Sequence, residues 1–532
     1  MLRRGAAAVS LLVLASCASV NEELLDAQLP EPPAAWSADS NAGAAPTGDW
    51  IGAFGDDTLY ALIDEALRHN NNLLAAAANL DAARASARVT RANMLPTLGA
   101  QAQAGRNAIV TDPSIAAQTG GNTSTSGLRA QELEDQYGID TNGDGKLDGL
   151  DLDGNGSLDA PIPNRRVYIN SFALGAQLSW ELDLWGRLSD ETRAAYKQAG
   201  ASLADFEAAR LSLAGAVAQG WFSLIEARQQ RELAERDTTA REDNLRVTER
   251  RFERGVASSL DVRLARSAHG SSKANLAFRQ QAEKEAARRI EVLLGRYPSA
   301  ELDAAAALPS LPDLQGAGAP GDILARRPDL IAAEARMEAA GLQARAARKQ
   351  MLPRLTLTSQ ISTSGPDLSD VIDPERLAGN IFAGLAQPLF QGGRILANSK
   401  RARAAAESAL LSYAQTALEA YEEAENALAA EYYLALREEA LKLAYEEAAS
   451  AEELTDRRYA SGAATIFNLL DAQTRRISAE SAYIQAQQQR VSNRVRLYLA
   501  IGGEFVTGEE VRTASAADVS GTIVPADSVT GE

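Results

Sequence analysis

Long stretches of the chain place apolar residues at the spacing of a helix that packs along its whole length. The clearest stretch follows position 188, where the three-four spacing is kept by Leu203, Phe206, Leu213, Val217 and Leu224. Such a narrow seam is typical of coiled coils rather than of globular helices. No proline occurs from 188 to 254, so the pattern predicts a helix about 100 Å long at a rise of about 1.5 Å per residue.

Shorter segments alternate with a period of two, which is typical of strands with two different faces. Between 168 and 182 the apolar positions are Phe172, Leu174, Ala176, Leu178 and Trp180, with small or polar residues between them. This clear alternation favours barrel strands between lipid and water. The segment 355–361 repeats it, whereas the strands expected at 97–105 and 379–388 alternate less cleanly and could equally belong to a soluble sheet.

The same plan occurs twice along the chain. The helix end at Leu95-Pro96 returns at Leu352-Pro353 after 257 positions, whereas Gly186 returns as Gly393 after 207. The helix reversal at Gly255 shares the second offset. The change of offset by 50 indicates an insertion in the first copy, and the repeat predicts one architecture for both copies.

The repeats divide the chain into consecutive segments, and the predicted fold class is mainly α with a small β part. The segments are a signal peptide (1–16), a lipidated arm (17–57), a first repeat (58–302), a linker (303–327), a second repeat (328–502) and a loosely ordered tail (503–532). The first repeat contains a helix, a strand hairpin (97–182) with an inserted acidic loop (111–167), and a long helical hairpin (188–298). In the second repeat, which also begins with a helix, the corresponding hairpins span 354–389 and 394–500.

Four strands per chain are too few for a closed barrel. About eight strands is the smallest number that leaves an interior, and open sheet edges are not tolerated in hydrocarbon. We therefore expect several chains to pool their strands and helices. The residues alone require more than one copy and do not fix the number.

The N-terminus has the features of a secretory signal. Arg3 and Arg4 precede a short apolar run to Leu14, and small residues lead to Cys17, the only cysteine. This placement resembles the lipobox of bacterial lipoproteins, which implies lipid on Cys17 and, with Ala18 next, sorting to the outer membrane. An ordinary signal peptide with an incidental cysteine is the alternative. No apolar run of about 18 residues follows, so no transmembrane helix is expected.

Charge and composition argue against nucleic-acid binding and against catalysis. The formal charge is −18, and no basic stripe offsets it, so we expect no nucleic-acid partner. The two histidines have no metal-ligand spacing, and the chain lacks a nucleophile elbow and a phosphate-binding loop. We therefore expect no enzymatic activity and no required cofactor.

The insertion of the first copy contains an acidic run with the spacing of a calcium-binding loop. Oxygen ligands at loop positions 1, 3, 5, 9 and 12 with glycine at position 6 define the EF-hand pattern. One run ends at position 151 and a second begins there, although the second has Ile162 at its twelfth position. The candidate ligands are Asp140, Asn142, Asp144, Lys146, Asp148, Asp151, Asp153, Asn155, Ser157 and Asp159, where Lys146 and Ser157 would contribute their backbone carbonyls. We expect weak calcium binding, against the alternative of a solvated acidic loop.

Several motifs follow the duplication in a fixed order. They are Trp50-x3-Phe54-x2-Asp57, Arg326-Arg327-Pro328-Asp329, Gly392-Gly393-Arg394 and Leu469-Leu470-Asp471. Together they resemble TolC-type outer-membrane efflux proteins, in particular the NodT-like lipoprotein branch that serves RND pumps. The resemblance covers about residues 50 to 502. It implies a passive outer-membrane exit duct for drugs or other toxic small solutes. It also implies a homotrimer with a 12-stranded β-barrel and a helical tunnel, with a periplasmic adaptor, an inner-membrane RND pump and outer-membrane lipid as partners.

The resemblance also implies two functional sites. The helix reversals would form a periplasmic tip where the adaptor docks, with ordinary turn chemistry as the alternative. The tip residues are Gly255, Val256, Ala257, Ser258, Gly462, Ala463, Ala464 and Thr465. At a channel gate, Phe467 would be an apolar plug and Asp471 one member of an acidic ring. The family often places arginine three residues after this aspartate, but here Thr474 stands there and Arg475 follows. The sequence therefore does not indicate which ion pairs close the gate.

Two other functions fit parts of the pattern. The exit duct of a type I protein secretion system has the same architecture, and a calcium-binding surface lipoprotein with a coiled-coil stalk would explain the helices and the acidic loop. The lipobox and the motif at 326–329 favour the efflux duct over the secretion duct. A stalk would not explain why strands are inserted at matching points of both copies.

Overall fold

The computed structural model describes residues 33–38, 50–111, 138–140, 149–151, 154, 156–157, 165–311 and 317–503. The signal peptide, Cys17, the C-terminal tail and most of the acidic loop lie outside the described residues. The chain divides into two compact units, a helical unit of Met1–Val89, Asp190–Ala347 and Ala397–Glu532 and a strand unit of Thr90–Ser189 and Arg348–Leu396. Each unit contains part of both sequence repeats, so the two copies do not form separate domains.

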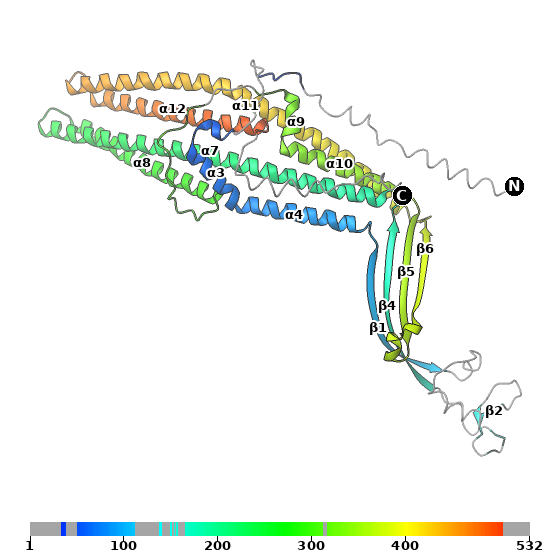
Figure 1. The fold of residues 1–532 in the computed structure, drawn as a ribbon. Coiled ribbons are helices and arrows are strands. Elements are labelled where there is room, and N and C mark those ends of the chain that lie inside the picture. Colours follow the sequence, from blue (N-terminus) through cyan, green and yellow to red (C-terminus); the bar gives the residue numbers. More distant parts are fainter. Residues whose placement is uncertain are drawn as a thin grey trace. The chain divides into compact units, whose positions relative to one another are not determined.

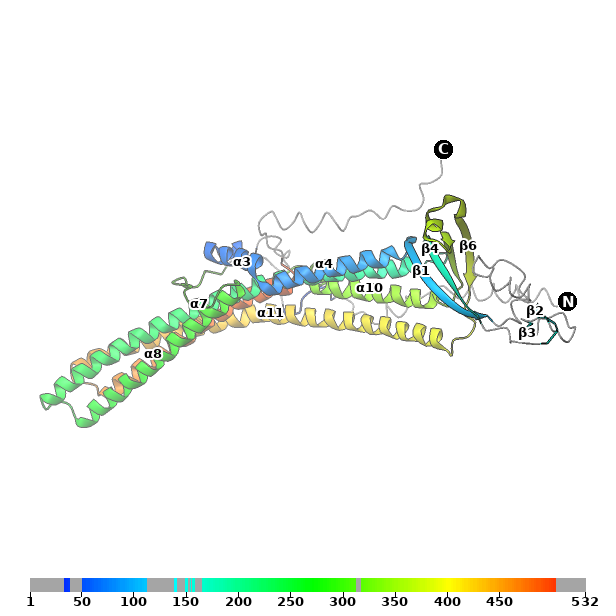
Figure 2. The same ribbon diagram turned by 90° about the horizontal axis from the view of Figure 1, so that it is seen from below.

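Two long helical hairpins dominate the helical unit. The first consists of α7 (Arg187–Glu253) and α8 (Ser259–Leu293), and the second of α11 (Arg394–Ala460) and α12 (Ile466–Ala500). The outgoing helices both have 67 residues and the returning helices both have 35. The hairpins run to the same end of the unit in both views (Figures 1 and 2). The 207-residue offset therefore holds over each hairpin without an insertion.

No helix in the described part of the chain combines the length and the apolar composition needed to cross a membrane.

Shorter helices precede each strand hairpin. They are α3 (Asp57–His69), α4 (Asn71–Ala92), α9 (Ile323–Arg326) and α10 (Pro328–Lys349), with 3-10 turns at Gly52–Phe54 (η1) and Pro320–Asp322 (η2). The sequence predicted a single helix before the first strand hairpin, from about Thr58 to Met94. This prediction was wrong, because the chain is extended at Asn70 and forms two helices. There the Asn70 Oδ1 accepts the backbone N–H groups of Asn72 and Leu73, both at 3.0 Å, and so caps α4.

The two copies share this break and its contacts. Asn70 has φ −67° and ψ 118°, and Arg327, 257 positions later, has φ −73° and ψ 120°. Asn70 Nδ2 donates to the carbonyl of Leu293 at the end of α8 (2.9 Å), and an Arg327 guanidinium nitrogen donates to the carbonyl of Ala500 at the end of α12 (3.2 Å). The duplication therefore extends to which backbone groups are paired at the base of each hairpin.

The core of the helical unit lies at this base and contains the first sequence motif. Trp50 stacks on Tyr498 with ring centroids 6.0 Å apart, and Phe54 packs on Phe222 at 5.3 Å. One carboxylate oxygen of Asp56 caps α3, while the other accepts the Trp221 indole N–H at 2.7 Å. The motif at 50–57 therefore holds the core together.

The strand unit is one antiparallel sheet in the order β1-β4-β5-β6. Its strands are β1 (Thr97–Thr111), β4 (Arg165–Leu182), β5 (Arg354–Gly365) and β6 (Ala378–Ala386), with the 3-10 turns η3 (Leu368–Ile372) and η4 (Pro374–Arg376) between the last two. A separate pair joins β2 (Gly138–Ile139) to β3 (Gly149–Leu150). Within the described residues β1 and β6 each have one neighbour, so the sheet has two open edges.

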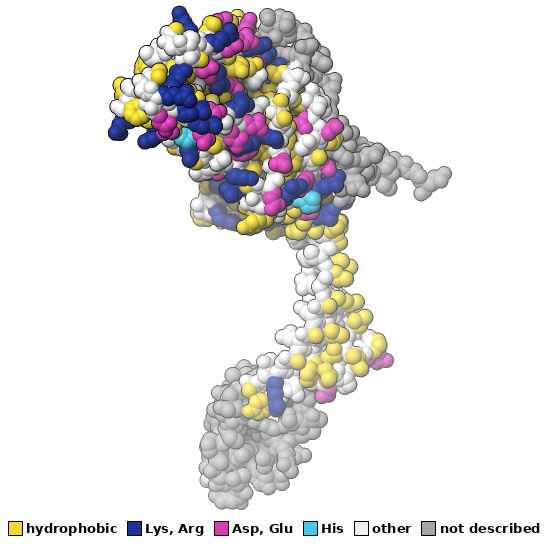
Figure 3. All heavy atoms as spheres, turned by 90° about the vertical axis from the view of Figure 1, so that its left-hand side faces the viewer, with side chains coloured by type: hydrophobic (Ala, Val, Ile, Leu, Met, Phe, Trp, Pro, Cys, Tyr) yellow, Lys and Arg dark blue, Asp and Glu magenta, His cyan; other side chains and the backbone are white. Residues whose placement is uncertain are grey.

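The register gathers the apolar positions of the four strands on one face. The cross-strand pairs on this face include Leu98 with Leu178, Trp180 with Leu357, and Leu355 with Leu385. The opposite face carries a polar row of Gln177, Gln360 and Asn380, which lie opposite one another across three strands. Hydrophobic side chains gather along one side of the strands (Figure 3). Phe382, opposite Thr358, is an exception on the polar face.

Candidate functional site: the tips of the long hairpins

The two helix reversals have the same backbone design. Gly255 (φ 75°) and Gly462 (φ 82°) adopt the left-handed conformation that ends each outgoing helix. The N–H of the next residue then donates to the carbonyl of Arg251 or of Arg458, both at 2.8 Å. Capping boxes start the returning helices, Ser258 with Asp261 in the first copy and Thr465 with Asn468 in the second. Both reversals are therefore tight turns whose helix ends are capped by hydrogen bonds.

The predicted tip residues are accessible at these turns. Gly255, Val256, Ser258, Gly462, Ala463 and Thr465 are exposed, and Ala257 and Ala464 are half-buried. A partner could therefore approach the backbone of both turns.

A contact between the hairpins, which the sequence interpretation missed, holds the tips together. The Tyr459 hydroxyl lies 3.1 Å from the Thr248 hydroxyl, and the Arg251 guanidinium lies over the Tyr459 ring at 4.6 Å. Arg251 also donates to the carbonyls of Tyr459 and Ala460, both at 3.2 Å. Tyr459 itself packs with the buried side chains of Ile466 and Leu469. We call Thr248, Arg251 and Tyr459 the tip clamp.

The predicted gate residues lie on one exposed face of α12. Phe467 is 66% exposed, so within its own chain it is not part of a core. Asp471 follows one turn later and accepts from Nε of Arg475 at 2.8 Å. Both side chains of this pair are exposed. Phe467 and the Asp471–Arg475 pair are therefore exposed along one face of α12.

Thr474, which replaces the arginine expected by resemblance, contacts another arginine. Arg241 on α7 donates to the Thr474 hydroxyl at 3.3 Å and pairs with Asp237 at 2.7 Å, where both charged side chains are buried. A neighbouring network joins Arg236 to Glu480 at 2.5 Å, and Arg476 pairs with both Glu480 and Glu452. These contacts tie α12 to α7 and α11.

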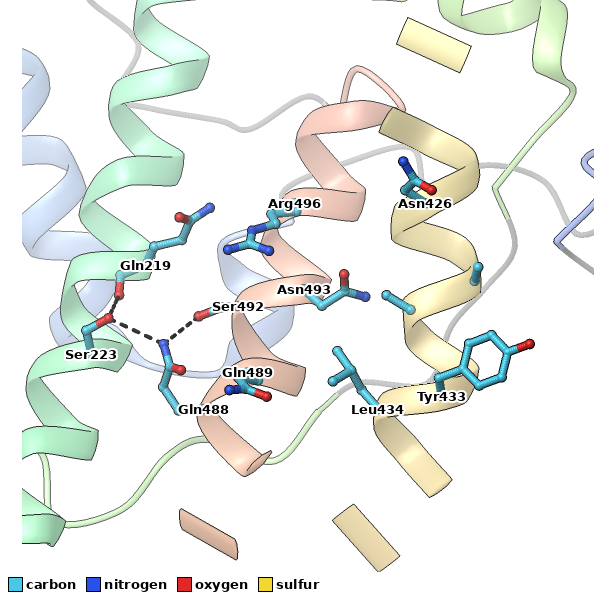
Figure 4. Close-up of a pocket in the computed structure, with 12 residues that line it drawn as sticks. Gln219, Ser223, Asn426, Tyr433, Leu434, Gln488, Gln489, Ser492, Asn493 and Arg496 are labelled. Atoms are coloured by element: carbon cyan, nitrogen blue, oxygen red, sulfur yellow. Dashed lines mark hydrogen bonds between the residues drawn. The ribbon is translucent and has the colours of Figure 1, made fainter. Parts of the chain in front are cut away.

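A polar groove lies further along the hairpins, between α7, α11 and α12. Its volume is about 690 Å³, and Figure 4 shows Gln488 reaching toward Ser223 on α7 and Ser492 on its own helix. The lining is mostly amide and hydroxyl groups, with Arg496 as its charged member. Among the described residues no group of three or more His, Cys, Asp or Glu could hold a metal ion. The groove is a polar seam between the three helices.

The motif at 326–329 anchors the base of the second hairpin. Arg327 is 8% exposed and pairs with Asp329 (2.7 Å) and with Glu423 on α11 (2.8 Å). Burial alone would raise the pKa of Asp329, but the hydrogen bonds and charge of Arg327 outweigh it and lower that pKa. The motif therefore joins α10 to α11 and α12.

The base of the first hairpin uses a different carboxylate. Glu291 is buried and accepts the backbone N–H groups of Ala300 (2.7 Å), Glu301 (2.8 Å) and Leu302 (3.2 Å). Burial favours its protonated form, but the three backbone hydrogen bonds outweigh burial and lower its pKa.

Comparison with known proteins identifies the class to which this architecture belongs. The model of the outer membrane efflux protein family matches residues 62–296 and 319–503, and the chain belongs to this family.

Individual relatives cover nearly the whole chain. Outer membrane protein OprJ of Pseudomonas aeruginosa is 30% identical over 501 residues, which cover 90% of this chain and 93% of OprJ. The toluene efflux pump outer membrane protein TtgC of Pseudomonas putida is 27% identical and covers 96% and 97% of the two chains. The open-state structure of the MtrE outer membrane channel of Neisseria gonorrhoeae matches with a TM-score of 0.70, 27% identity, and coverage of 89% of this chain and 98% of MtrE.

These findings confirm several predictions made from the sequence. The mainly helical fold with a small four-stranded sheet, the location in the outer membrane and the role as an efflux exit duct are confirmed. The family is one of channels rather than enzymes. Neither the secretion duct nor the surface lipoprotein is favoured by any of these relatives.

Proposed function

We propose that three copies of this chain close into one passive duct, with twelve strands around a lumen and with a helical tunnel. The observation that supports this most directly is the sheet, which has one apolar face and open edges at β1 and β6. Such a sheet is stable in hydrocarbon only when its edges pair. Three four-stranded sheets give enough strands for a lumen lined by the polar face.

The solutes that fit this duct are drugs, solvents and other small toxic molecules delivered by an inner-membrane RND pump. Two relatives are named for the export of toluene and of pyoverdine. The polar row of Gln177, Gln360 and Asn380 supports passive passage, since neutral amides favour no charge.

Two adjacent residues of β6 test whether the sheet spans a membrane. Ile381 belongs to the apolar face and Asn380 to the polar face. Ile381→Arg should prevent outer-membrane insertion, because arginine on the lipid face of a membrane strand costs about 2–4 kcal/mol. Asn380→Arg, the matched control, should insert normally and shift the ion selectivity of the duct in a planar bilayer toward anions. Equal insertion of the two variants would contradict the proposal.

Export assays separate the efflux duct from the secretion duct. Cells lacking this protein should become several-fold more sensitive to small toxic compounds while secreting proteins at the normal level. Loss of a secreted protein with unchanged sensitivity would favour the secretion duct instead. A stalk protein would give no conductance in the bilayer experiment.

The exposed turns at 255–258 and 462–465 are the surface we propose for the periplasmic adaptor. Their small side chains and well-capped helices support close approach by a partner backbone. At the same end, Phe467 and the Asp471–Arg475 pair of three copies would form the constriction of the closed duct. Lipid on Cys17 would hold the mature N-terminus at the outer membrane, and mass spectrometry of the purified protein would detect it.

The acidic loop is a candidate calcium site. Asp140 and Asp151 directly follow β2 and β3, and Asp151 Oδ2 accepts the Gly156 N–H at 2.9 Å, as expected between positions 1 and 6 of such a loop. The other candidate ligands, apart from Ser157, lie outside the described residues. Calcium should protect bonds in 140–160 from protease, and identical cleavage with chelator would exclude the site.

A further inference from the structure

The duplication gives the chain a second set of residues equivalent to the tip clamp, and this set does not form the same contact within the chain. With the 207-residue offset, Thr248 and Arg251 of the first hairpin correspond to Thr455 and Arg458 of the second, and Tyr459 corresponds to Phe252. Tyr459 is 8% exposed, whereas Phe252 is 47% exposed. Arg458 is exposed as well. One version of the contact is therefore made within the chain, whereas in the other set Phe252 and Arg458 are exposed and Thr455 is half-buried.

An apolar stripe on α11 leads to the open set. Tyr432, Leu436 and Leu443 are exposed and fall on one face of the helix. They correspond to Ile225, Gln229 and Arg236 on the face of α7 that packs inside the chain. Ile225 is fully buried, and Arg236 pairs with Glu480 on α12. The second hairpin thus exposes the face that the first hairpin uses for hairpin-to-hairpin packing.

A second copy of this chain fits this face, because the chain already contains the complementary surface. The contact between hairpins one and two uses α7 on one side and α11 with α12 on the other. A neighbouring copy presents hairpin one, whose exposed Phe252 and Val292 correspond to Tyr459 and to Leu499, which packs against Gly215. Repetition of one contact around an axis is how homo-oligomers close.

We propose that the tip clamp is repeated between copies, with Arg458 and Thr455 of one copy on Phe252 of the next, and that this contact is the weaker of the two. The inference rests on the proposed trimeric duct. Arginine stacks on phenylalanine as it does on tyrosine. Phe252 has no hydroxyl, however, so Thr455 keeps only the bond to Ala451 within its own helix (2.7 Å), whereas Thr248 also meets Tyr459. The duct tip therefore opens between copies rather than within a chain.

Thiol cross-linking tests the contact itself. The variant Phe252→Cys/Thr455→Cys, treated in membranes with a short thiol-to-thiol linker, should give dimers and trimers on denaturing gels. The matched variant Thr248→Cys/Tyr459→Cys should give an internal link and run as a monomer. Internal links in both variants would overturn the proposal. Native gels of the same samples measure assembly separately. A trimer that forms no cross-links would contradict this inference alone, whereas the absence of any oligomer would contradict the proposed duct.

Conductance tests which contact opens. Phe252→Tyr supplies the missing hydroxyl and should lower the single-channel open probability several-fold. Adding Thr455→Ala should return the open probability to the original level, while Thr455→Ala alone should change little. Tyr459→Phe serves as the comparison within the chain. The proposal is wrong if Phe252→Tyr conducts as the original protein does, or if Thr455→Ala fails to reverse its effect.

Discussion

The two hairpins of this chain have one backbone and two sets of side chains. At the base, the neutral amide of Asn70 bonds to Leu293, whereas the charged Arg327 bonds to Ala500 and two carboxylates. Midway, Arg231 on α7 pairs with Glu283 on α8 at 2.7 Å, and the equivalent pair, Glu438 with Arg490, has the same distance and reversed signs. The repeated backbone therefore fixes the positions at which contacts occur, while the side chains that make these contacts differ between the two copies.

The largest expected difference lies at the base of the hairpins. Arg327→Ala removes a buried guanidinium that joins Asp329, Glu423 and the carbonyl of Ala500. It should destabilise the protein by about 3 kcal/mol, the upper end for hydrogen bonds to charged groups. The equivalent Asn70→Ala removes a neutral helix cap and should cost about 1 kcal/mol. Apparent unfolding temperatures of the two purified variants measure the difference. Equal shifts would show that charge at this position adds nothing.

A smaller effect is expected at Glu291, which corresponds to Tyr498 in the second copy. Glu291→Gln should cost about 2 kcal/mol, because three backbone N–H groups lose a charged acceptor. The pKa of Glu291 is lowered in the folded state. Its contribution is therefore present above the unfolded pKa of about 4.3 and is lost as the pH falls through the lower folded value.

Unfolding measured against pH tests this difference between the copies. The stability advantage of the original protein over Glu291→Gln should shrink below about pH 4.3, where the unfolded carboxyl begins to bind a proton. A constant difference down to the lowest accessible pH would contradict the assigned role. Tyr498→Phe, at the matched position of the second copy, should show no such pH dependence.

Substitutions at the two helix reversals should have equal effects on stability, in contrast to those at the bases of the hairpins. Gly255→Ala and Gly462→Ala should each cost about 1 kcal/mol, because an alanine in the left-handed conformation is strained. No atom lies within 4 Å of the added methyl group at either site, so strain acts without a clash. A markedly larger loss at one turn, measured by thermal unfolding of the trimer, would reveal packing against another copy.

The smallest net effect is expected when both members of a reversed ion pair are exchanged. Arg231→Glu alone should cost about 1 kcal/mol, and the double variant Arg231→Glu/Glu283→Arg should recover most of it, because the second hairpin shows that these positions accept the reversed charges. A double-mutant cycle on stability measures the coupling. If the double variant is no more stable than the single one, the surrounding charges determine which charge each position accepts.

Periodicity and the duplication predicted the long helices and the strands, since both are properties of residues spaced along one element. Contacts between elements were harder to predict. Nothing near Thr248 indicates that Tyr459 will meet it, and the exchange of Thr474 for the expected arginine gave no hint of Arg241 on another helix. The break at Asn70 was predictable in principle. Pro328 forces Arg327 into an extended conformation, and the 257-residue offset transfers that break to Asn70.

The equal lengths of the two hairpins keep their tips at the same level. Each outgoing helix of 67 residues spans about 100 Å at about 1.5 Å per residue. Removing two turns from one hairpin alone would draw its tip back by about 10 Å and separate Thr248 from Tyr459, while the same removal from both would keep the tips level. The length of such a duct can therefore change only when both hairpins change together. A gain or loss of helical turns in one repeat is tolerated only if the other repeat gains or loses the same number.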